Sequence, residues 1–199
     1  ILSCTKKDAD SIRSSSVRML KRLGYFDDVA TTEQDFKDNM WAGTFHSFSN
    51  SIIRKYGSET QKNRRIITSS EQREILKEIV TSLTLSDSSS PSASKSVKSA
   101  LADLPGIGSL VYNVQKTISF WKEASCEADS DCIVPIVPKS AALASANISP
   151  LYEKKLLSLN AIDAGDLIPT AVSLLMNNEN VLNSMRGRLK QCVVDEFQD

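Results

Sequence analysis

Short apolar runs alternate with segments of helical periodicity at the start of this chain, and that order constrains its fold most. Residues 1–5 form the first apolar run, and apolar residues at helical spacing then continue to Gly24. A second apolar run, 40–44, leads into another segment of helical spacing at 45–56. Strand, helix, strand, helix in this order predicts an α/β fold with a parallel sheet.

The middle of the chain follows a different pattern, dominated by helical spacing. A short strand is expected at 65–68, and Ser69 with Gln72 fits the capping box that begins a helix. Further helices are predicted over 75–83, 111–121 and 151–159. Ser-rich sequence cannot build a core, so a disordered surface loop is predicted across 84–96. We therefore predict an all-helical subdomain at 61–160, inserted into the α/β domain.

The end of the chain returns to the first pattern. Helical faces over 167–175 and 181–189 precede a terminal apolar run, 191–194. The α/β domain is therefore predicted in two parts, 1–60 and 161–199, on either side of the insertion.

Adjacent acids, Asp195 and Glu196, follow the terminal apolar run directly. Such a pair is what a nucleotide-hydrolysing site needs, because one carboxylate holds Mg²⁺, usually through water, and the other orients or deprotonates the attacking water. The alternative is a strand that ends in surface acids. The longer string that continues to Asp199 arises less often by chance, and it favours the catalytic interpretation.

A second motif, Gly43-Thr44-Phe45-His46-Ser47-Phe48, lies about 150 residues earlier. At a strand-to-helix junction, backbone N–H groups and hydroxyls can hold a phosphate, and nearby aromatic rings can stack on unpaired bases. The alternative is that Phe45 and Phe48 belong to the core and that His46 is a satisfied polar group. Both can hold, since Phe48 also faces the apolar stripe of the helix.

Charge and cysteine content add weaker constraints. Lys+Arg and Asp+Glu are both 24, so the net charge gives no hint of a polyanionic partner. A basic cluster in the first 22 residues is either a binding patch or a solvated helix face. Four scattered cysteines and a single histidine argue against a zinc site and for a reducing intracellular compartment, with Cys4 and Cys192 as small hydrophobes in apolar runs. No apolar run approaches the length of a membrane span, so no membrane partner is expected.

Together, the two motifs resemble those of the UvrD/PcrA/Rep family of superfamily 1 DNA helicases. Two further segments are similar to family motifs. Residues 1–9 stand where the family has a strand, then Thr-Asn-Lys-Ala-Ala and a helix, although Cys4 replaces an aromatic residue and Lys6 replaces Asn. Residues 160–168 are similar to a Leu-Asp-Phe-Asp-Asp-Leu-Leu segment, with Ala164-Gly165 in place of its aromatic-acid pair. The resemblance runs from end to end.

The resemblance implies a role for each candidate residue. Asp195 would hold Mg²⁺ on ATP, and Glu196 would be the catalytic base. Gln198 and Asp199 would link the nucleotide state to DNA binding. The residues implied in contact with single-stranded DNA are Thr5, Lys6, Thr44, Phe45, His46 and Ser47.

The resemblance also implies a fold and an activity. The fold would be the first RecA-like domain of a P-loop NTPase with an inserted helical subdomain, as an incomplete fragment. The string Gly-x-x-x-x-Gly-Lys-Ser/Thr is absent and is expected just before Ile1, so the fragment alone is expected to be inactive. The full-length protein is expected to use Mg·ATP, with a second RecA-like domain, to move along single-stranded DNA, normally 3′ to 5′, and to unwind duplex at a junction. DNA repair or recombination follows by family association, in the nucleus or in the bacterial cytoplasm.

Two alternatives stay open. One is a helicase-like protein without ATPase activity that serves as a DNA-binding scaffold. The other is a non-enzymatic binding module in which Leu104-Pro105-Gly106-Ile107-Gly108 is the hairpin of a helix-hairpin-helix unit. Its glycines would let backbone amides approach a phosphate closely. That module predicts DNA binding that survives changes at Thr44 and His46 but fails when Gly106 and Gly108 become bulky.

Overall fold

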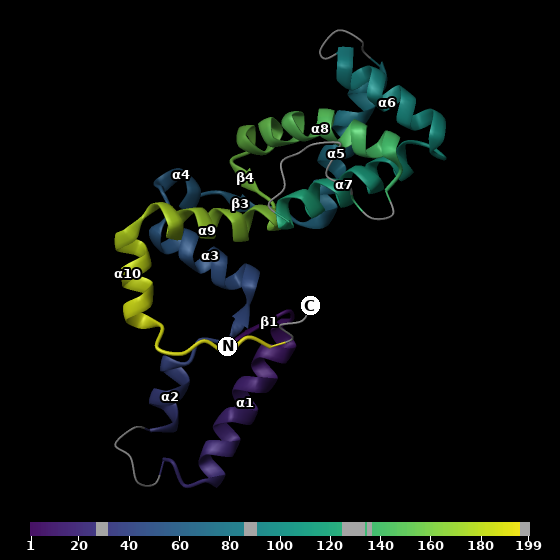
Figure 1. Ribbon diagram of the computed structural model, residues 1–199. Helices are drawn as coiled ribbons and strands as arrows, with labels where there is room; N and C mark the ends of the chain where they lie inside the picture. Colours follow the sequence, from purple (N-terminus) through teal and green to yellow (C-terminus); the bar gives the residue numbers. More distant parts are fainter. Residues whose placement is uncertain (27–31, 86–90, 125–133, 135–136, 196–199) are drawn as a thin grey trace. The chain divides into compact units, whose positions relative to one another are not determined.

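The computed structural model describes residues 1–26, 32–85, 91–124, 134 and 137–195 (Figure 1). The chain divides into two compact units. Unit 1 comprises residues 1–56 and 171–199, and unit 2 comprises residues 57–170. The role of these units as helicase subdomains stays a prediction. No helix among the described residues is long and apolar enough to cross a membrane.

Unit 1 contains a small parallel sheet. Strands β1 (Leu2–Ser3) and β2 (Gly43–Thr44) pair in parallel, with Leu2 opposite Gly43 and Ser3 opposite Thr44. On the other side of β1, Leu2 forms a parallel bridge with Val194. The Leu2 amide donates to the Val193 carbonyl at 2.8 Å. The predicted parallel pairing is therefore confirmed, and β1 lies between β2 and the terminal run. The paired segments are shorter than the apolar runs that predicted them.

The helices of unit 1 are α1 (Lys6–Arg22), α2 (Glu33–Asn39), α3 (Phe45–Tyr56) and α10 (Glu179–Arg188), and α9 (Leu167–Asn177) continues into it from unit 2. Gly24 follows α1 with a φ of 69°, a left-handed conformation that glycine adopts without strain, so the predicted stop is confirmed. On α3, Ile52 and Ile53 are buried as their spacing predicted. On α1 the face predicted by helical spacing is only partly buried: Ala9 is buried, Ile12, Ser16 and Leu20 are half-buried, and Leu23 is 70% exposed.

The cysteine interpretation needs a correction. Cys4 and Cys192 are both exposed rather than packed in a core. The physical reason is that Cys4 follows the last paired residue of β1, and Cys192 precedes the short bridged segment at Val194. Neither residue therefore lies in the paired part of the sheet. Cys126 and Cys132 lie outside the described residues.

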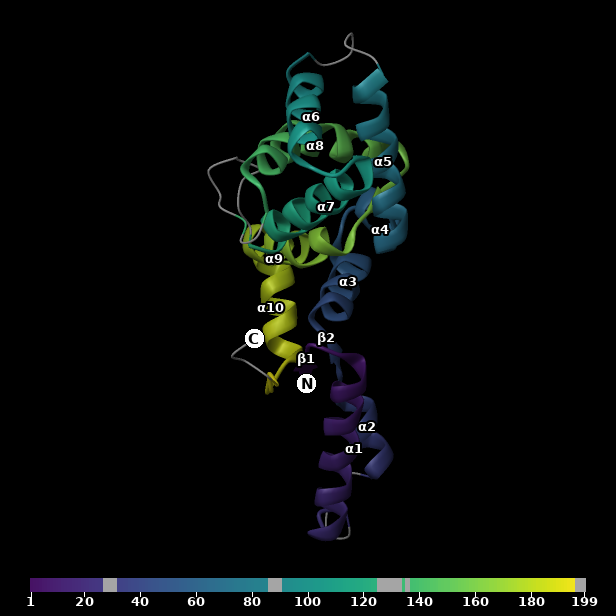
Figure 2. The same cartoon turned by 90° about the vertical axis from the view of Figure 1, so that its right-hand side faces the viewer.

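Unit 2 is built around four long helices, α5 (Ser69–Leu85), α6 (Pro91–Asp103), α7 (Ile107–Glu123) and α8 (Lys139–Ser158) (Figures 1 and 2). All four contribute to one apolar core, whose fully buried members include Leu76, Val80, Val97, Leu110, Val114, Ile118, Ile148, Tyr152 and Leu156. The apolar stripes predicted for α5 and α7 are the faces that enter this core.

The prediction of an all-helical subdomain at 61–160 is wrong in one respect, because unit 2 also contains two short strands. Besides the short helix α4 (Glu59–Lys62), it contains β3 (Arg65–Ile66) and β4 (Ala161–Ile162), which pair in parallel. A 3-10 turn, η1 (Ala164–Asp166), follows β4 and leads into α9. The sequence predicts a strand at 65–68, and β3 confirms it. Its partner β4 lies in the motif-like segment 160–168 and was not predicted, because two paired residues carry no detectable periodicity.

The predicted disordered loop at 84–96 is largely wrong. Helix α5 continues to Leu85 and α6 begins at Pro91, while 86–90 lie outside the described residues. Ser94 and Ser96 are buried, and Ser96 Oγ donates to the Ala93 carbonyl at 2.9 Å. Small side chains let α6 pack closely against α8, and the hydroxyl is satisfied within its own helix.

Two further helix boundaries differ from the prediction. Helix α8 begins at Lys139 rather than at 151 and passes through Pro150, because its first half buries alanines and serines that show no apolar period. The capping box of α5 is one residue earlier than predicted. The Thr68 amide donates to Glu71 Oε2 at 2.8 Å, and the Glu71 amide donates to Thr68 Oγ1 at 3.2 Å. Hydrogen bonds from Thr68 and Arg65 lower the pKa of Glu71 to about 2.

Candidate functional site

Three segments of unit 1 end at the same edge of its sheet. Because β1, β2 and the bridged segment at Val194 are parallel, their carboxyl ends lie together. Ligands of open α/β sheets bind at this edge. Thr5 follows β1, Thr44 ends β2, and Asp195 follows Val194. The structure thus brings together predicted residues that are up to 190 positions apart (195 − 5).

Asp195 is fixed at the end of the terminal segment. Its amide donates to the Leu2 carbonyl at 2.9 Å, and Ser3 Oγ donates to its Oδ2 at 3.4 Å. Ser3 is fully buried and Asp195 is half-buried, so one side of the carboxylate faces the protein. Glu196, Gln198 and Asp199 lie outside the described residues, and their roles stay sequence predictions.

The donor chemistry at Asp195 suits Mg²⁺ bound together with a phosphate. Magnesium prefers oxygen ligands and keeps several waters, so one or two carboxylates plus substrate phosphates are enough to hold it. Among the described residues, no three His, Cys, Asp or Glu side chains form a group that could enclose a metal. The Asp195 carboxylate is the kind of single protein ligand that an ion shared with a nucleotide needs.

Thr44 begins α3 by capping it. The Ser47 amide donates to Thr44 Oγ1 at 3.2 Å, and Ser47 Oγ donates to the Thr44 carbonyl at 2.8 Å. His46 and Ser47 are exposed in the first turn, and Phe45 is half-buried. This geometry leaves the His46 ring on the surface, where a ligand can reach it, while Phe45 also contributes to packing.

Thr5 caps α1 in a similar way. The Asp8 amide donates to Thr5 Oγ1 at 3.2 Å, and Thr5 Oγ1 also donates to the Asp8 carboxylate. The Thr5 hydroxyl is therefore engaged within the protein. Lys6 is exposed at the first position of α1, so a phosphate contact at this end of the site falls to its ammonium group and to backbone amides.

Trp41 is a candidate that the sequence analysis missed. Its ring lies 5.1 Å from the Phe48 ring, centroid to centroid, and the residue is 39% exposed. A Cβ on Gly43 would come within 2.7 Å of the Trp41 ring and 2.8 Å of Ser47 Oγ, so only glycine permits this arrangement. An exposed aromatic ring beside a phosphate-type site can stack on an unpaired base. The only sequence feature that could have indicated it is its position two residues before Gly43-Thr44, and a tryptophan at that position matches no motif considered above.

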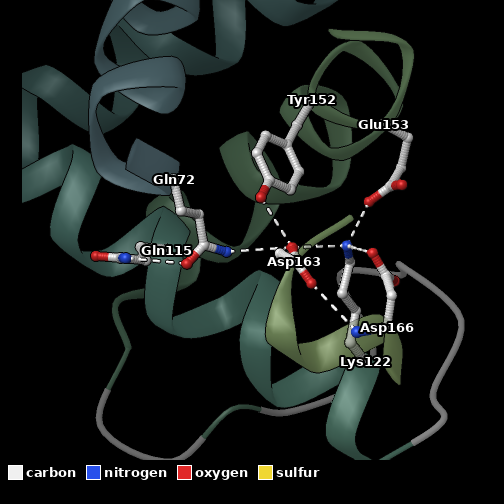
Figure 3. Close-up of polar contacts among 7 residues, drawn as sticks. All are labelled: Gln72, Gln115, Lys122, Tyr152, Glu153, Asp163 and Asp166. Carbon is white, nitrogen blue, oxygen red and sulfur yellow. Dashed lines mark hydrogen bonds and ion pairs between the residues drawn. The ribbon is translucent and has the colours of Figure 1, made fainter. Parts of the chain in front are cut away.

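Unit 2 holds a second polar cluster, around Lys122 (Figure 3). Lys122 Nζ lies 2.6 Å from Glu153 Oε1 and 2.8 Å from both Asp163 Oδ2 and Asp166 Oδ2. The side chains of Lys122 and Asp163 are 12% and 5% exposed. Gly165 makes room for this approach, because a Cβ there would lie 3.1 Å from Lys122 Cβ.

Neutral side chains complete the bonding around Asp163 (Figure 3). Tyr152 Oη donates to Asp163 Oδ2 at 2.8 Å, and Gln72 Nε2 approaches the same atom at 3.4 Å. Gln115 Nε2 in turn donates to Gln72 Oε1 at 3.0 Å. We call the seven residues the Lys122 cluster: Gln72, Gln115, Lys122, Tyr152, Glu153, Asp163 and Asp166. It joins α5, α7, α8 and η1. Asp163 and Asp166 belong to the motif-like segment 160–168, but nothing in the sequence indicated that they meet Lys122.

Burial and charge set the protonation of this cluster. Burial lowers the pKa of Lys122, but attraction to Asp163 and Asp166 outweighs it and the net shift is upward. Burial, reinforced by Asp163, raises the pKa of Tyr152. Burial and repulsion from Asp163 raise the pKa of Asp166 to about 6, against an opposing effect of Lys122. At neutral pH, Lys122 is therefore charged and Tyr152 is neutral.

Asp166 should make stability depend on pH in a definite direction. Its folded pKa of about 6 lies above its ordinary 3.8, so its protonation stabilises the fold. This contribution is fully present below about pH 4 and is lost as the pH rises through 6. We expect the protein to be more stable at pH 5 than at pH 7 by about 1 kcal/mol from this group, and Asp166→Asn to lose that difference. Urea unfolding of both proteins at the two pH values measures it, and equal pH dependence would contradict the assignment.

The family model described as the UvrD/REP helicase N-terminal domain matches residues 1–199. No curated protein matches the chain. The family match spans both units, including the sheet edge in unit 1 and the Lys122 cluster in unit 2.

Proposed function

Because the chain belongs to the UvrD/REP helicase family, we propose that it is part of an ATP-dependent DNA helicase whose nucleotide and DNA contacts meet at the sheet edge of unit 1. The observation that carries this proposal is the placement of Thr5, Thr44 and Asp195 at the carboxyl ends of three adjacent parallel segments. Two of these residues belong to segments with DNA-contacting counterparts in the family, and the third belongs to its nucleotide motif.

On the nucleotide side, we assign Asp195 to the magnesium ion and Glu196 to the attacking water. Mg²⁺, when bound, would neutralise charge on the phosphates of ATP. The bond from Ser3 Oγ and the backbone pairing with Leu2 hold the Asp195 carboxylate at the strand end. Glu196, the next residue, would accept the proton of the water as a general base.

On the DNA side, the start of α3 supplies the contacts. His46 and Ser47 are exposed in its first turn, and the N-terminus of a helix favours a phosphate. Trp41 adds a ring on which a base can stack. Since β1 pairs with both β2 and the Val194 segment, a shift at Asp195 needs to cross only one strand to reach Thr44. Gln198 and Asp199 would carry the same coupling to the rest of the protein.

The activity of the whole protein is part of this proposal. It would move along one DNA strand, normally 3′ to 5′, through ATP hydrolysis between this domain and a second RecA-like domain, and open duplex at a junction. A role in DNA repair or recombination and an intracellular location follow from the family. These 199 residues contain no Gly-x-x-x-x-Gly-Lys-Ser/Thr string, so we expect them to hydrolyse no ATP by themselves.

Binding of single-stranded DNA tests the DNA side directly. We expect the double variant Thr44→Ala, His46→Ala to bind a fluorescent 20-nucleotide oligo-dT about tenfold more weakly, because a hydrogen bond to a charged phosphate contributes about 1.5 kcal/mol. Fluorescence anisotropy gives the dissociation constants. Thr44→Ser keeps the cap of α3 and should bind like the unsubstituted chain.

A second substitution separates this proposal from the helix-hairpin-helix alternative. Gly106 has a φ of 123° and precedes α7, so a side chain there would strain the backbone. Gly108 lies within α7, and a Cβ at that position would meet nothing within 4 Å. Gly108→Val therefore adds bulk without strain. Loss of binding in Gly108→Val, with full binding in the Thr44/His46 variant, would replace our proposal with that alternative.

A further inference from the structure

Four side chains converge where the end of α3 meets α10 in unit 1. Tyr56 Oη and Ser184 Oγ share a hydrogen bond of 3.1 Å. Lys55 Nζ lies 5.2 Å from the centroid of the Tyr56 ring. The hydrogen bond with Ser184 has the largest effect and lowers the pKa of Tyr56; burial opposes it, and smaller effects of Arg188 and Lys55 lower the pKa further. We call Lys55, Tyr56, Ser184 and Arg188 the α3–α10 cluster.

Within the part of the chain that the structure describes, no carboxylate pairs with the positive charges of this cluster. Helix α3 contains no acidic residue, and α10 contains only Glu179, in its first turn and away from Arg188 in the last turn. Neither Lys55 nor Arg188 forms an ion pair with a carboxylate of the described residues. Arg188 is exposed, as are its neighbours Arg186 and Lys190.

The chemistry of the cluster suits a phosphate. Ammonium and guanidinium groups only donate hydrogen bonds, and the two hydroxyls can donate one more between them after their mutual bond. Such a set matches the oxygens of a phosphate group, which only accept. Ser184 and Arg188 are four residues apart and so lie on one face of α10, toward Tyr56.

Helix α3 connects this cluster to the candidate DNA site. One side of the helix is marked by residues spaced by four, three and four positions, namely Thr44, Phe48, Ser51 and Lys55. From Thr44 to Lys55 the rise is roughly 16 Å, at 1.5 Å per residue. A strand stacked as in B-form DNA, at roughly 3.4 Å per nucleotide, would cover that length with about five nucleotides, and an extended single strand would need fewer. One strand can therefore reach both ends of α3.

We propose that the α3–α10 cluster binds a backbone phosphate of the single-stranded DNA that contacts Thr44, a few nucleotides along the strand. The proposal rests on the DNA contact proposed above for the start of α3. It adds a second anchor for the same strand, provided by the far end of the helix and by α10. The anchor recognises phosphate and is therefore independent of base sequence.

A matched pair of double variants tests the anchor. Lys55→Ala with Arg188→Ala should weaken binding of the 20-nucleotide oligo-dT roughly tenfold at 0.1 M NaCl. The slope of log affinity against log salt should become shallower by about 1.4, because each phosphate contact on a single strand contributes about 0.7. Arg186→Ala with Lys190→Ala removes the same charge, but Arg186 lies two residues from both Ser184 and Arg188 and faces away from the cluster. This control should keep both the affinity and the slope.

The length of the oligonucleotide provides a second arm. A dinucleotide of thymidine bound at Thr44 is too short to reach the cluster even when it is extended, so the Lys55/Arg188 variant should bind it like the unsubstituted chain. Unchanged binding of the 20-mer by this variant, or an equal loss in the Arg186/Lys190 control, would overturn the anchor and leave the site at Thr44 intact. Full binding by the Thr44/His46 variant would overturn the proposed function instead. Circular dichroism of each variant confirms that the exposed substitutions leave the fold unchanged.

Discussion

Replacing Lys122 with methionine is expected to lower the free energy of unfolding by about 3–5 kcal/mol, because it leaves buried carboxylates without their cation. Asp163 is 5% exposed and Lys122 provides its ion pair at 2.8 Å. Methionine fills a similar volume, so the loss would reflect charge rather than an empty cavity. Urea unfolding followed by circular dichroism gives the free energy, and a lower midpoint with an unchanged slope would confirm it.

Two control proteins make this prediction specific to burial. Lys155→Met breaks an exposed pair with Glu78, at 2.9 Å, and should cost no more than about 1 kcal/mol. The triple variant Lys122→Met, Asp163→Asn, Asp166→Asn removes the stranded charge and should recover part of the loss. If Lys122→Met proved as mild as Lys155→Met, the cluster would not depend on its charge balance.

The parts of the fold that sequence predicted are those where apolar residues recur at a fixed spacing. Ile52 and Ile53 of α3, and Val114 and Ile118 of α7, are buried as their spacing indicated. Periodicity did not predict the buried positions where the buried residues are small, as at Ser94 of α6. Such residues carry no apolar signal, and their burial follows from close approach of two helices, which depends on the whole chain.

The start of α5 shows how tertiary contacts choose between local alternatives. Both Thr68 with Glu71 and Ser69 with Gln72 fit the capping-box signature. The structure uses the first pair, and Gln72 is instead 7% exposed and bonded to Gln115. Local sequence could not decide this, because the partner of Gln72 lies 43 residues away.

Some residues of the candidate site were predicted from the sequence and others were not. Short motifs placed Thr44 and Asp195, and the parallel order of strands predicts that residues after them share an edge. Trp41 was not predicted, because its position depends on the absence of a side chain at Gly43. The Lys122 cluster escaped because its members come from four separate elements and have no common spacing.

In the full-length protein that contains this segment, Glu196→Gln should reduce the turnover number for ATP hydrolysis by roughly 10²–10⁴, the usual contribution of a general base. Binding of ATP should be retained, because the amide has the size of the carboxylate and Asp195 would still be available to hold the metal. Asp195→Asn should act differently. It should raise the Mg²⁺ concentration needed for half-maximal hydrolysis, since the ion would lose its charged ligand. Steady-state ATPase assays across a magnesium titration, with single-stranded DNA present, separate the two effects.

The same assays decide between an active helicase and a scaffold without ATPase activity. Glu179→Gln removes a carboxylate from the first turn of α10, away from the sheet edge, and should leave hydrolysis unchanged. If the full-length protein bound DNA but hydrolysed no ATP before any substitution, the scaffold would be the correct function. If it hydrolysed ATP and Glu196→Gln had no effect, the water would be activated by another group. A loss confined to the Asp195 and Glu196 variants would place hydrolysis at the end of the terminal run, one strand away from the segment that begins α3.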